Sequence, residues 1–191
     1  MDYNVIFVAG PQGSGKGTQG KRLAEKLGFL FWEMGGTLRR ILASDSPLGK
    51  KLSAMERGAL LSDELIIEVL QDQLPLIPHE KGIVFDGVPR RLGQGQFLVE
   101  YCKSHGMDKM ATIFIDVPRE ECVRRLLLRA RNESRTDDTS EAIAQRFRDY
   151  DEAIKAPMDY LRTQTTFITI DGTPAPDVIA ANINKALGID E

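Results

Sequence analysis

The chain has 191 residues, 42% of them apolar, and a formal net charge of −3 at pH 7. This length and apolar fraction are enough for one substantial hydrophobic core, so we expect a single α/β domain. The slightly acidic balance argues against nucleic acid or an anionic membrane as the main partner. No apolar run approaches the roughly 18 residues that a membrane-spanning helix needs, so we expect a cytoplasmic protein without a membrane partner.

The chain contains two cysteines, Cys102 and Cys122. They lie far apart in the sequence, and neither has a second cysteine at the spacing of a zinc site. We therefore expect neither zinc nor a disulfide framework, and both side chains should be small, buried hydrophobic groups.

The most informative stretch lies near the start of the chain. The apolar, β-branched run at residues 5–9 predicts a strand, and residues 21–27 have the composition and apolar spacing of a helix. Between them lies a loop with the phosphate-loop pattern G-x-x-x-x-G-K-[ST], except that position 17 is glycine and the hydroxyl comes one residue later, at Thr18.

This loop should act as a cradle for an anion. The glycines at positions 10, 13, 15 and 17 are expected to take dihedral angles that other residues avoid, which brings backbone N–H groups close to a ligand. Lys16 adds a full positive charge. An ordinary glycine-rich turn is the alternative, and the strand before the loop and the helix after it favour the phosphate site.

Strands and helices alternate along the rest of the chain. Further strands are expected at residues 29–32, 82–86, 111–117 and 166–170. Further helices are expected at residues 37–42, 48–57, 62–74, 94–104, 118–129, 138–153 and 174–187. This alternation predicts a parallel sheet covered by helices on both faces, with ligands at the carboxyl ends of the strands.

Local signals mark several helix boundaries. Gly35 and Gly36 should break the chain before the helix at residue 37. Ser62 should cap the helix that follows it, and Asp138 with a glutamate three residues later resembles the start of a capping box. Pro157 should disturb the long helix that begins near residue 138.

Asp86 is a candidate magnesium residue. It comes directly after an apolar strand, where a phosphate-loop protein needs a carboxylate to hold Mg²⁺ or its waters. The alternative is a turn-forming Asp-Gly pair with no metal role. The phosphate loop near the start of the chain favours magnesium.

Several arginines form a second candidate feature. Arg125 and Arg129 lie four residues apart on one face of an expected helix, and Arg135 and Arg146 flank the start of the next one. Most arginine-rich helices simply present a solvated surface. Here, however, planar guanidinium groups suit the oxygens of a migrating phosphoryl group, and their convergence would indicate two phosphate-bearing ligands.

Taken together, these residues resemble the adenylate kinases, within the nucleoside monophosphate kinase family. The matching motifs run in order along nearly the whole chain, and they are residues 10–19, Leu38-Arg39, Gly58, residues 62–65, residues 86–90, Gln94, residues 116–118, Arg125 with Arg129, residues 135–138, Arg146 with Tyr150, Pro157 and residues 171–172.

The resemblance implies a three-layer α/β/α fold with a five-stranded parallel sheet, of the P-loop nucleoside monophosphate kinase type. It implies one kinase domain with a core (about 1–34, 75–129 and 138–191), an NMP-binding insertion (about 35–74) and a short lid (about 130–137). The implied reaction is ATP + AMP to two ADP with Mg²⁺, and the short lid implies no zinc. A monomer is the simplest expectation for a chain that must open and close.

The resemblance also implies roles for individual residues. The implied ATP-binding residues are Gly13, Ser14, Gly15, Lys16, Gly17, Thr18, Arg129 and Gly172. The implied AMP-binding residues are Met34, Arg39, Ala59, Leu60, Leu61, Gly87, Arg90, Gln94, Arg135 and Arg146. The implied catalytic residues are Lys16, Arg90, Arg125, Arg129, Arg135 and Arg146, and Asp86 would order Mg²⁺ through water.

Some positions depart from the family pattern. Where adenylate kinases usually read Ser-Thr-Gly-Asp, residues 33–36 read Glu-Met-Gly-Gly, so that Met34 replaces a hydroxyl near the acceptor base and Gly36 removes a carboxylate near the magnesium waters. Val88 and Arg91 also differ from the usual residues. These departures keep two alternatives open: a UMP/CMP kinase or other nucleoside monophosphate kinase, and a nucleotide-binding sensor with weak catalysis.

Overall fold

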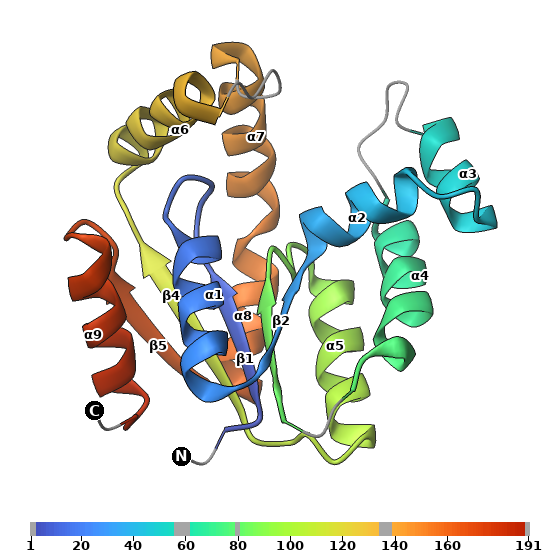
Figure 1. Ribbon diagram of the computed structural model, residues 1–191, viewed down its shortest axis with the longest axis horizontal. Helices are drawn as coiled ribbons and strands as arrows, with labels where there is room; N and C mark the ends of the chain where they lie inside the picture. The colour runs from blue at the N-terminus through green and yellow to red at the C-terminus, as the bar shows by residue number, and fades with distance from the viewer. Residues whose placement is uncertain (1–2, 56–61, 79–80, 134–138, 190–191) are drawn as a thin grey trace.

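The computed structural model describes residues 3–55, 62–78, 81–133 and 139–189. In these residues five strands form one parallel sheet in the order β2-β3-β1-β4-β5 (Figure 1). The strands are β1 (Val5–Ala9), β2 (Leu30–Glu33), β3 (Ile83–Asp86), β4 (Met110–Asp116) and β5 (Thr166–Asp171). The predicted five-stranded parallel sheet is therefore confirmed.

Helices connect successive strands, as parallel pairing requires. The α-helices of the described residues are α1 (Lys16–Leu27), α2 (Met34–Leu42), α3 (Pro47–Met55), α4 (Asp63–Gln73), α5 (Leu92–Ser104), α6 (Arg119–Glu133), α7 (Ser140–Ala153), α8 (Lys155–Gln164) and α9 (Pro176–Ala186). A short 3₁₀ helix, η1 (Leu74–Leu76), follows α4.

The sheet lies between two hydrophobic cores. Val5 and Phe7 of β1 belong to the core that α4, α5 and α8 cover, whereas Ile6 and Val8 belong to the core that α1, α6 and α9 cover. All four side chains are at most 2% exposed. A central parallel strand is apolar on both faces because helices cover both sides, and this confirms the predicted three-layer arrangement.

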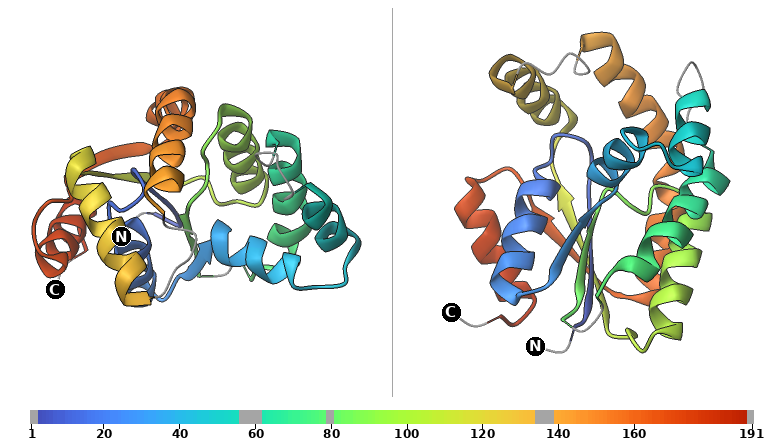
Figure 2. Two further views of the ribbon diagram at one scale, coloured as in Figure 1. Left: turned by 90° about the horizontal axis from the view of Figure 1, so that it is seen from above. Right: turned by 45° about the vertical axis from the view of Figure 1, so that its right-hand side comes forward.

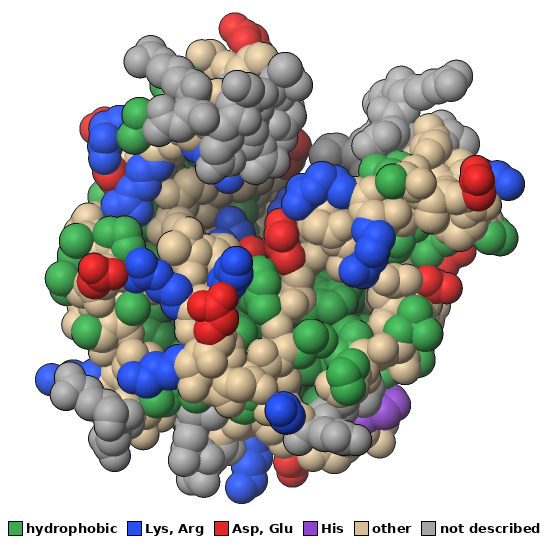
Figure 3. All heavy atoms as spheres, viewed as in Figure 1, with side chains coloured by type: hydrophobic (Ala, Val, Ile, Leu, Met, Phe, Trp, Pro, Cys, Tyr) green, Lys and Arg blue, Asp and Glu red, His purple; other side chains and the backbone are tan. Residues whose placement is uncertain are grey.

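Two groups of helices flank the space at the carboxyl ends of the strands. Helices α2, α3 and α4 stand on one side, and α6 and α7 stand on the other (Figures 1 and 2). Seen as spheres, the molecule is hollowed between them, and Lys and Arg side chains lie on the walls of the hollow (Figure 3). Segments distant in sequence therefore meet at the edge where the sequence predicted ligands.

One predicted helix start was wrong. Helix α2 begins at Met34 and continues through Gly35 and Gly36, which were expected to break the chain. The side chains of Met34, Thr37 and Ile41 are buried on one face of α2. This packing holds the first turn in place and offsets the cost of about 1 kcal/mol for each helical glycine.

The other helix boundaries follow mostly from local signals. Ser62 caps α4 as predicted, because its Oγ accepts a hydrogen bond from the N–H of Leu65 at 3.3 Å. Thr139, rather than Asp138, caps α7, and its hydroxyl accepts from the N–H of Ala142 at 3.2 Å. Asp138 itself lies outside the described residues. The disturbance predicted at Pro157 corresponds to the boundary between α7 and α8.

Both cysteines are buried and free, as predicted. Burial raises the pKa of the Cys102 thiol to about 12, so this thiol is protonated at neutral pH. In the described part of the chain, no helix is both long enough and apolar enough to span a membrane.

Candidate active site

The loop between β1 and α1 is packed so tightly that two of its positions require glycine. Gly10 has φ of 142°, and a Cβ there would lie 2.5 Å from the carbonyl oxygen of Ile115. Gly13 has φ of 84°, and a Cβ there would lie 2.5 Å from the carbonyl oxygen of Cys122. The loop thus lies against the end of β4 and the start of α6, which fixes its backbone before any ligand binds.

The loop delivers the first turn of α1 to a ligand. Gly15 is the N-cap of α1 in a left-handed conformation, and no side chain caps the N–H groups of that turn. Such unpaired N–H groups, at the positive end of the helix dipole, suit an anion. Gly17 differs from the expectation, because it lies within the helix. Its missing side chain instead leaves room for Asp86, whose Oδ2 would be 3.1 Å from a Cβ at position 17.

A cavity of about 1250 Å³ lies above the loop, between the two groups of helices. This exceeds the roughly 300–1,000 Å³ typical of a site for one small ligand. Six buried side-chain polar atoms have no hydrogen-bond partner among the described residues, and five of them belong to residues that line this cavity. Those five residues are Gln12, Ser14, Gln19, Asp86 and Tyr150. Buried polar atoms are normally paired, so their concentration here indicates polar ligands or water.

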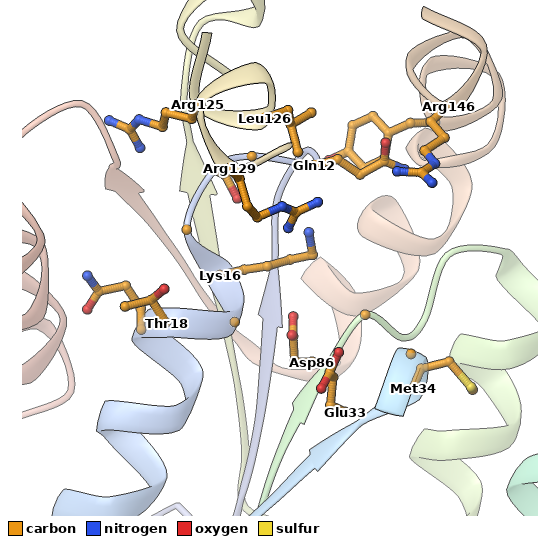
Figure 4. A pocket seen from close by; sticks show the side chains of 18 of the residues that line it. Gln12, Lys16, Thr18, Glu33, Met34, Asp86, Arg125, Leu126, Arg129 and Arg146 are labelled. Carbon is orange, nitrogen blue, oxygen red and sulfur yellow. The ribbon is translucent and has the colours of Figure 1, made fainter. Parts of the chain in front are cut away.

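Lys16 extends from the start of α1 into the cavity (Figure 4). Its ammonium donates to the carbonyl oxygen of Pro11 at 3.3 Å. Its pKa is lowered from the ordinary value, chiefly because burial disfavours the charged form; the positive charges of Arg90 and Arg129 act in the same direction, and the carboxylate of Asp86 opposes them. Two phosphate-binding candidates from distant segments thus lie within electrostatic reach of Lys16.

Asp86 ends β3 and faces Lys16 across the cavity floor (Figure 4). It is 6% exposed, and its Oδ1 has no partner among the described residues. Burial raises its pKa, and the charge of Lys16 partly opposes this effect. No group of three or more His, Cys, Asp or Glu side chains in the described ranges could hold a metal alone. An unpaired carboxylate oxygen beside a phosphate site does fit Mg²⁺, which usually binds through one or two carboxylates, water and substrate phosphates.

The predicted arginines do not all point the same way. Arg129 of α6 extends toward Lys16, and Arg146 reaches the cavity from α7 (Figure 4). Arg125 points away from Lys16, because its Nε donates to Glu121 at 2.7 Å and its Nη2 donates to the carbonyl oxygen of Thr173 at 3.3 Å. All three line the cavity, but Arg125 faces its α9 side in this structure.

Apart from Arg146, the predicted acceptor residues that the structure describes lie on the α2 and α5 side of the cavity. Met34 is 3% exposed and lines it, together with Gly87. Arg39 lines it too, and its Nη2 lies 3.3 Å from Oε1 of Glu33.

Gln94 has both ends of its amide engaged. Its Nε2 donates to Oδ1 of Asp63 at 2.8 Å, and its Oε1 accepts from the backbone N–H of Arg90 at 2.9 Å. The side chain is 4% exposed. The amide that the resemblance assigned to adenine therefore links α4 to the start of α5 in this structure, and it would have to exchange Asp63 for a base.

Two predicted ATP-binding residues lie apart from the charged side chains of Lys16, Asp86 and Arg129. Thr18 is exposed, and its side chain points away from Lys16 (Figure 4). Gly172 donates its N–H to the carbonyl oxygen of Asp116 at 2.8 Å, and the segment 173–176 lines the cavity in its place. The remaining predicted residues, Ala59, Leu60, Leu61 and Arg135, lie outside the described residues.

Sequence reasoning missed several residues that line the cavity. Glu121 holds Arg124 and Arg125, and hydrogen bonds from these two guanidinium groups lower its pKa to about 2. Its spacing four residues before Arg125 was a usable signal for that pair. Gln12 and Glu33 also line the cavity. No pattern in the sequence marked Gln12, and Glu33 stood out only as a departure from the family pattern.

A doubly covered parallel sheet, a glycine loop opening into a helix and a cationic cavity at the strand ends define a phosphate-loop enzyme of nucleoside phosphates. Residues 8–166 match the family described as adenylate kinase. The chain is 39% identical over 186 residues to the adenylate kinase of Thermus thermophilus, covering 97% of each chain.

Two further relatives agree. The chain is 38% identical over 186 residues to adenylate kinase 1 of Schistosoma mansoni, covering 96% of this chain and 92% of the relative. It is 35% identical over 183 residues to the adenylate kinase of Stenotrophomonas maltophilia, covering 95% and 98%. The chain therefore belongs to the adenylate kinase family and is a phosphotransferase, which confirms the predicted resemblance.

Proposed function

We propose that this chain transfers the γ-phosphoryl group of ATP to AMP, reversibly, giving two ADP. The observation that carries the proposal is the meeting of Lys16, Arg90 and Arg129 at one cavity of about 1250 Å³. A cavity of this size has room for a donor and an acceptor nucleotide together. The cations lie where the phosphates of two such ligands would meet.

The geometry suits a reaction in which the protein mainly positions the phosphates and stabilises their charge. The N–H groups of the loop and Lys16 would bind the phosphates of ATP, while Arg90 and Arg39 would bind the phosphate of AMP. Arg129 and Arg146 would neutralise charge that develops on the transferring group. Bound Mg²⁺ would draw charge from the terminal phosphates of ATP, and Asp86 would accept hydrogen bonds from the waters of the metal.

We extend the proposal to the predicted division into a core, an NMP-binding insertion at 35–74 and a lid at 130–137. Support comes from the positions of α2, α3 and α4 on one side of the cavity and of α6 and α7 on the other (Figure 2). Part of the insertion and half of the lid lie outside the described residues. Closure of both segments would exclude water from the transferring phosphoryl group. Matching positions of α2–α4 and of the end of α6 in the free and doubly liganded enzyme would contradict this.

The acceptor assay tests the proposal most directly. A coupled assay measures kcat/KM for AMP, CMP, UMP and GMP at saturating Mg-ATP. AMP should be the best acceptor, and a higher kcat/KM for CMP or UMP would select the pyrimidine kinase instead. Met34 at the acceptor side and the engagement of Gln94 with Asp63 are the observations that keep this second candidate in the test. Binding of a linked bisubstrate dinucleotide without any ADP formation would instead indicate a sensor.

The predicted monomeric state and cytoplasmic location are part of the same proposal. Light scattering coupled to size-exclusion chromatography should give one chain per particle, both with and without nucleotides. Cell fractionation tests the location, and a protein without a nucleic-acid partner should elute unchanged after nuclease treatment.

A further inference from the structure

Two carboxylates stand at the strand ends beneath Lys16. Asp86 and Glu33 are the last residues of β3 and β2, and the two residues are partners in the parallel register. Register partners on adjacent strands project their side chains to the same face of a sheet. Their carboxylates accordingly lie side by side at the cavity floor (Figure 4), and the charge of Glu33 adds to burial in raising the pKa of Asp86.

The carboxylate of Glu33 occupies space that two glycines leave open. A Cβ at Gly36 would lie 3.1 Å from Oε2 of Glu33, and a Cβ at Gly35 would lie 3.1 Å from Oε1. Position 36 is where the family pattern places an aspartate. The carboxylate missing from position 36 is thus replaced, in nearly the same place, by one that reaches over from the end of β2.

We propose that Glu33 is a positioning residue for magnesium, and that its carboxylate, beside Asp86, accepts hydrogen bonds from metal-bound water in place of an aspartate at position 36. This inference rests on the proposed function. An independent observation supports it: Oδ1 of Asp86 is buried, lines the cavity and has no partner among the described residues. Two adjacent carboxylates with spare acceptor capacity match the hydrated, phosphate-bound form in which proteins usually hold Mg²⁺.

The contact between Glu33 and Arg39 is compatible with this role. The two side chains are 42% and 62% exposed, and exposed ion pairs of this kind contribute about 0–1 kcal/mol. When Arg39 turns to an acceptor phosphate, the Glu33 carboxylate can therefore turn to metal-bound water at little cost.

The test measures metal affinity without turnover. Mn²⁺ replaces Mg²⁺, and electron paramagnetic resonance follows its binding to the full chain saturated with an ATP analogue that has a methylene group between the β- and γ-phosphates. Glu33→Gln should weaken Mn²⁺ binding by about tenfold, as changes in groups that orient metal ligands typically do. Affinity for the analogue in EDTA should not fall. Glu25→Gln, an exposed site on α1, removes the same charge away from the cavity and should leave Mn²⁺ affinity unchanged.

A relocation variant tests the geometry itself. Glu33→Ser combined with Gly36→Asp moves the carboxylate back to position 36 and removes the side chain that a Cβ there would meet. This double variant should restore Mn²⁺ affinity to within about threefold of the parent, whereas Glu33→Ser alone should not. Failure of a folded double variant to recover affinity would overturn the inference.

Arg39→Gln separates the metal role from the ion pair. It removes the contact with Glu33 but keeps the carboxylate, so it should not weaken Mn²⁺ binding. The inference is wrong if Glu33→Gln binds Mn²⁺ like the parent, or if Arg39→Gln weakens binding as much as Glu33→Gln does. These outcomes concern metal binding alone. The proposed function fails on a different result, namely no phosphorylation of AMP by the parent chain or a higher kcat/KM for CMP or UMP than for AMP.

Discussion

Replacement of Arg90 should damage acceptor use far more than ATP binding. Arg90 follows β3 and Gly87, and its Nε donates to the carbonyl oxygen of Gly87 at 2.9 Å. This bond leaves the two terminal nitrogens of the guanidinium group for a bidentate contact with one phosphate. Arg90→Ala removes both contacts.

The expected magnitude follows from those two hydrogen bonds. A hydrogen bond to a charged group contributes about 1.5–3 kcal/mol, so the loss of two amounts to roughly 3–6 kcal/mol. This corresponds to a fall of about 10²- to 10⁴-fold in kcat/KM for AMP. Arg90→Lys keeps the charge without the planar pair of donors, and its loss should be smaller, at about tenfold.

The assay varies AMP at saturating Mg-ATP, and calorimetry measures the affinity of the ATP analogue. Arg40→Ala is the control. Arg40 lies on α2, its guanidinium group donates to Gln73 of α4 at 3.0 Å, and it does not line the cavity. The control should stay within about twofold of the parent in both measurements, a change too small for the loss of a charged contact. An Arg90→Ala enzyme that lost ATP-analogue affinity as much as acceptor kcat/KM would refute the assignment.

Three further changes test other parts of the structure. Lys16→Ala should lower kcat by at least about 10²-fold in the coupled assay, because an aimed charge on the transferring phosphate is lost while the loop amides remain. Asp86→Asn should raise the Tm of the free enzyme in calorimetry at about pH 8, because a carboxyl whose pKa is raised on folding costs stability when it is ionised. The gain should shrink as the pH falls through the raised pKa of Asp86. Gly172→Ala should lower the free energy of unfolding by roughly 1–3 kcal/mol, because its Cβ would lie 2.4 Å from Cγ2 of Ile115 and 2.5 Å from Cγ2 of Val117. Each kcal/mol lost should lower Tm by about 2–4 °C. An unchanged kcat for Lys16→Ala would contradict the first expectation. An unchanged Tm would contradict the second for Asp86→Asn at about pH 8 and the third for Gly172→Ala.

The sequence predicted best what local chemistry dictates. The phosphate loop follows from glycines at fixed spacing, and the structure shows the reason at Gly13, where a Cβ would meet the carbonyl oxygen of Cys122. The strands follow from short runs of β-branched, aromatic and other apolar residues, and Ser62 identified a helix start by its cap. The cap joins residues three positions apart, and the positive φ of Gly13 belongs to its own backbone, so the local pattern identifies both features even though a distant segment packs against the loop.

What the sequence could not predict depends on contacts between distant segments. Gln94 meets Asp63 across 31 positions of the chain, and Arg125 meets the carbonyl oxygen of Thr173 across 48. No spacing rule connects such residues. The glycines at 35 and 36 were misinterpreted as a break for the same reason, because burial of Met34 on the neighbouring core holds α2 in place from its first residue.

The charged groups of the site are held at a cost to the stability of the free enzyme. Burial shifts the pKa values of Lys16 and Asp86 toward their neutral forms, and their mutual attraction does not offset it. In the free enzyme these charges therefore cost folding energy, and Glu33 adds repulsion next to Asp86. Phosphates and a divalent cation would supply the missing partners, and ligands that bind only the folded state stabilise it by mass action. The unusual residues at 33–36 preserve the negative charge at the cavity floor. The carboxylate that position 36 lacks is supplied by Glu33, at the end of β2.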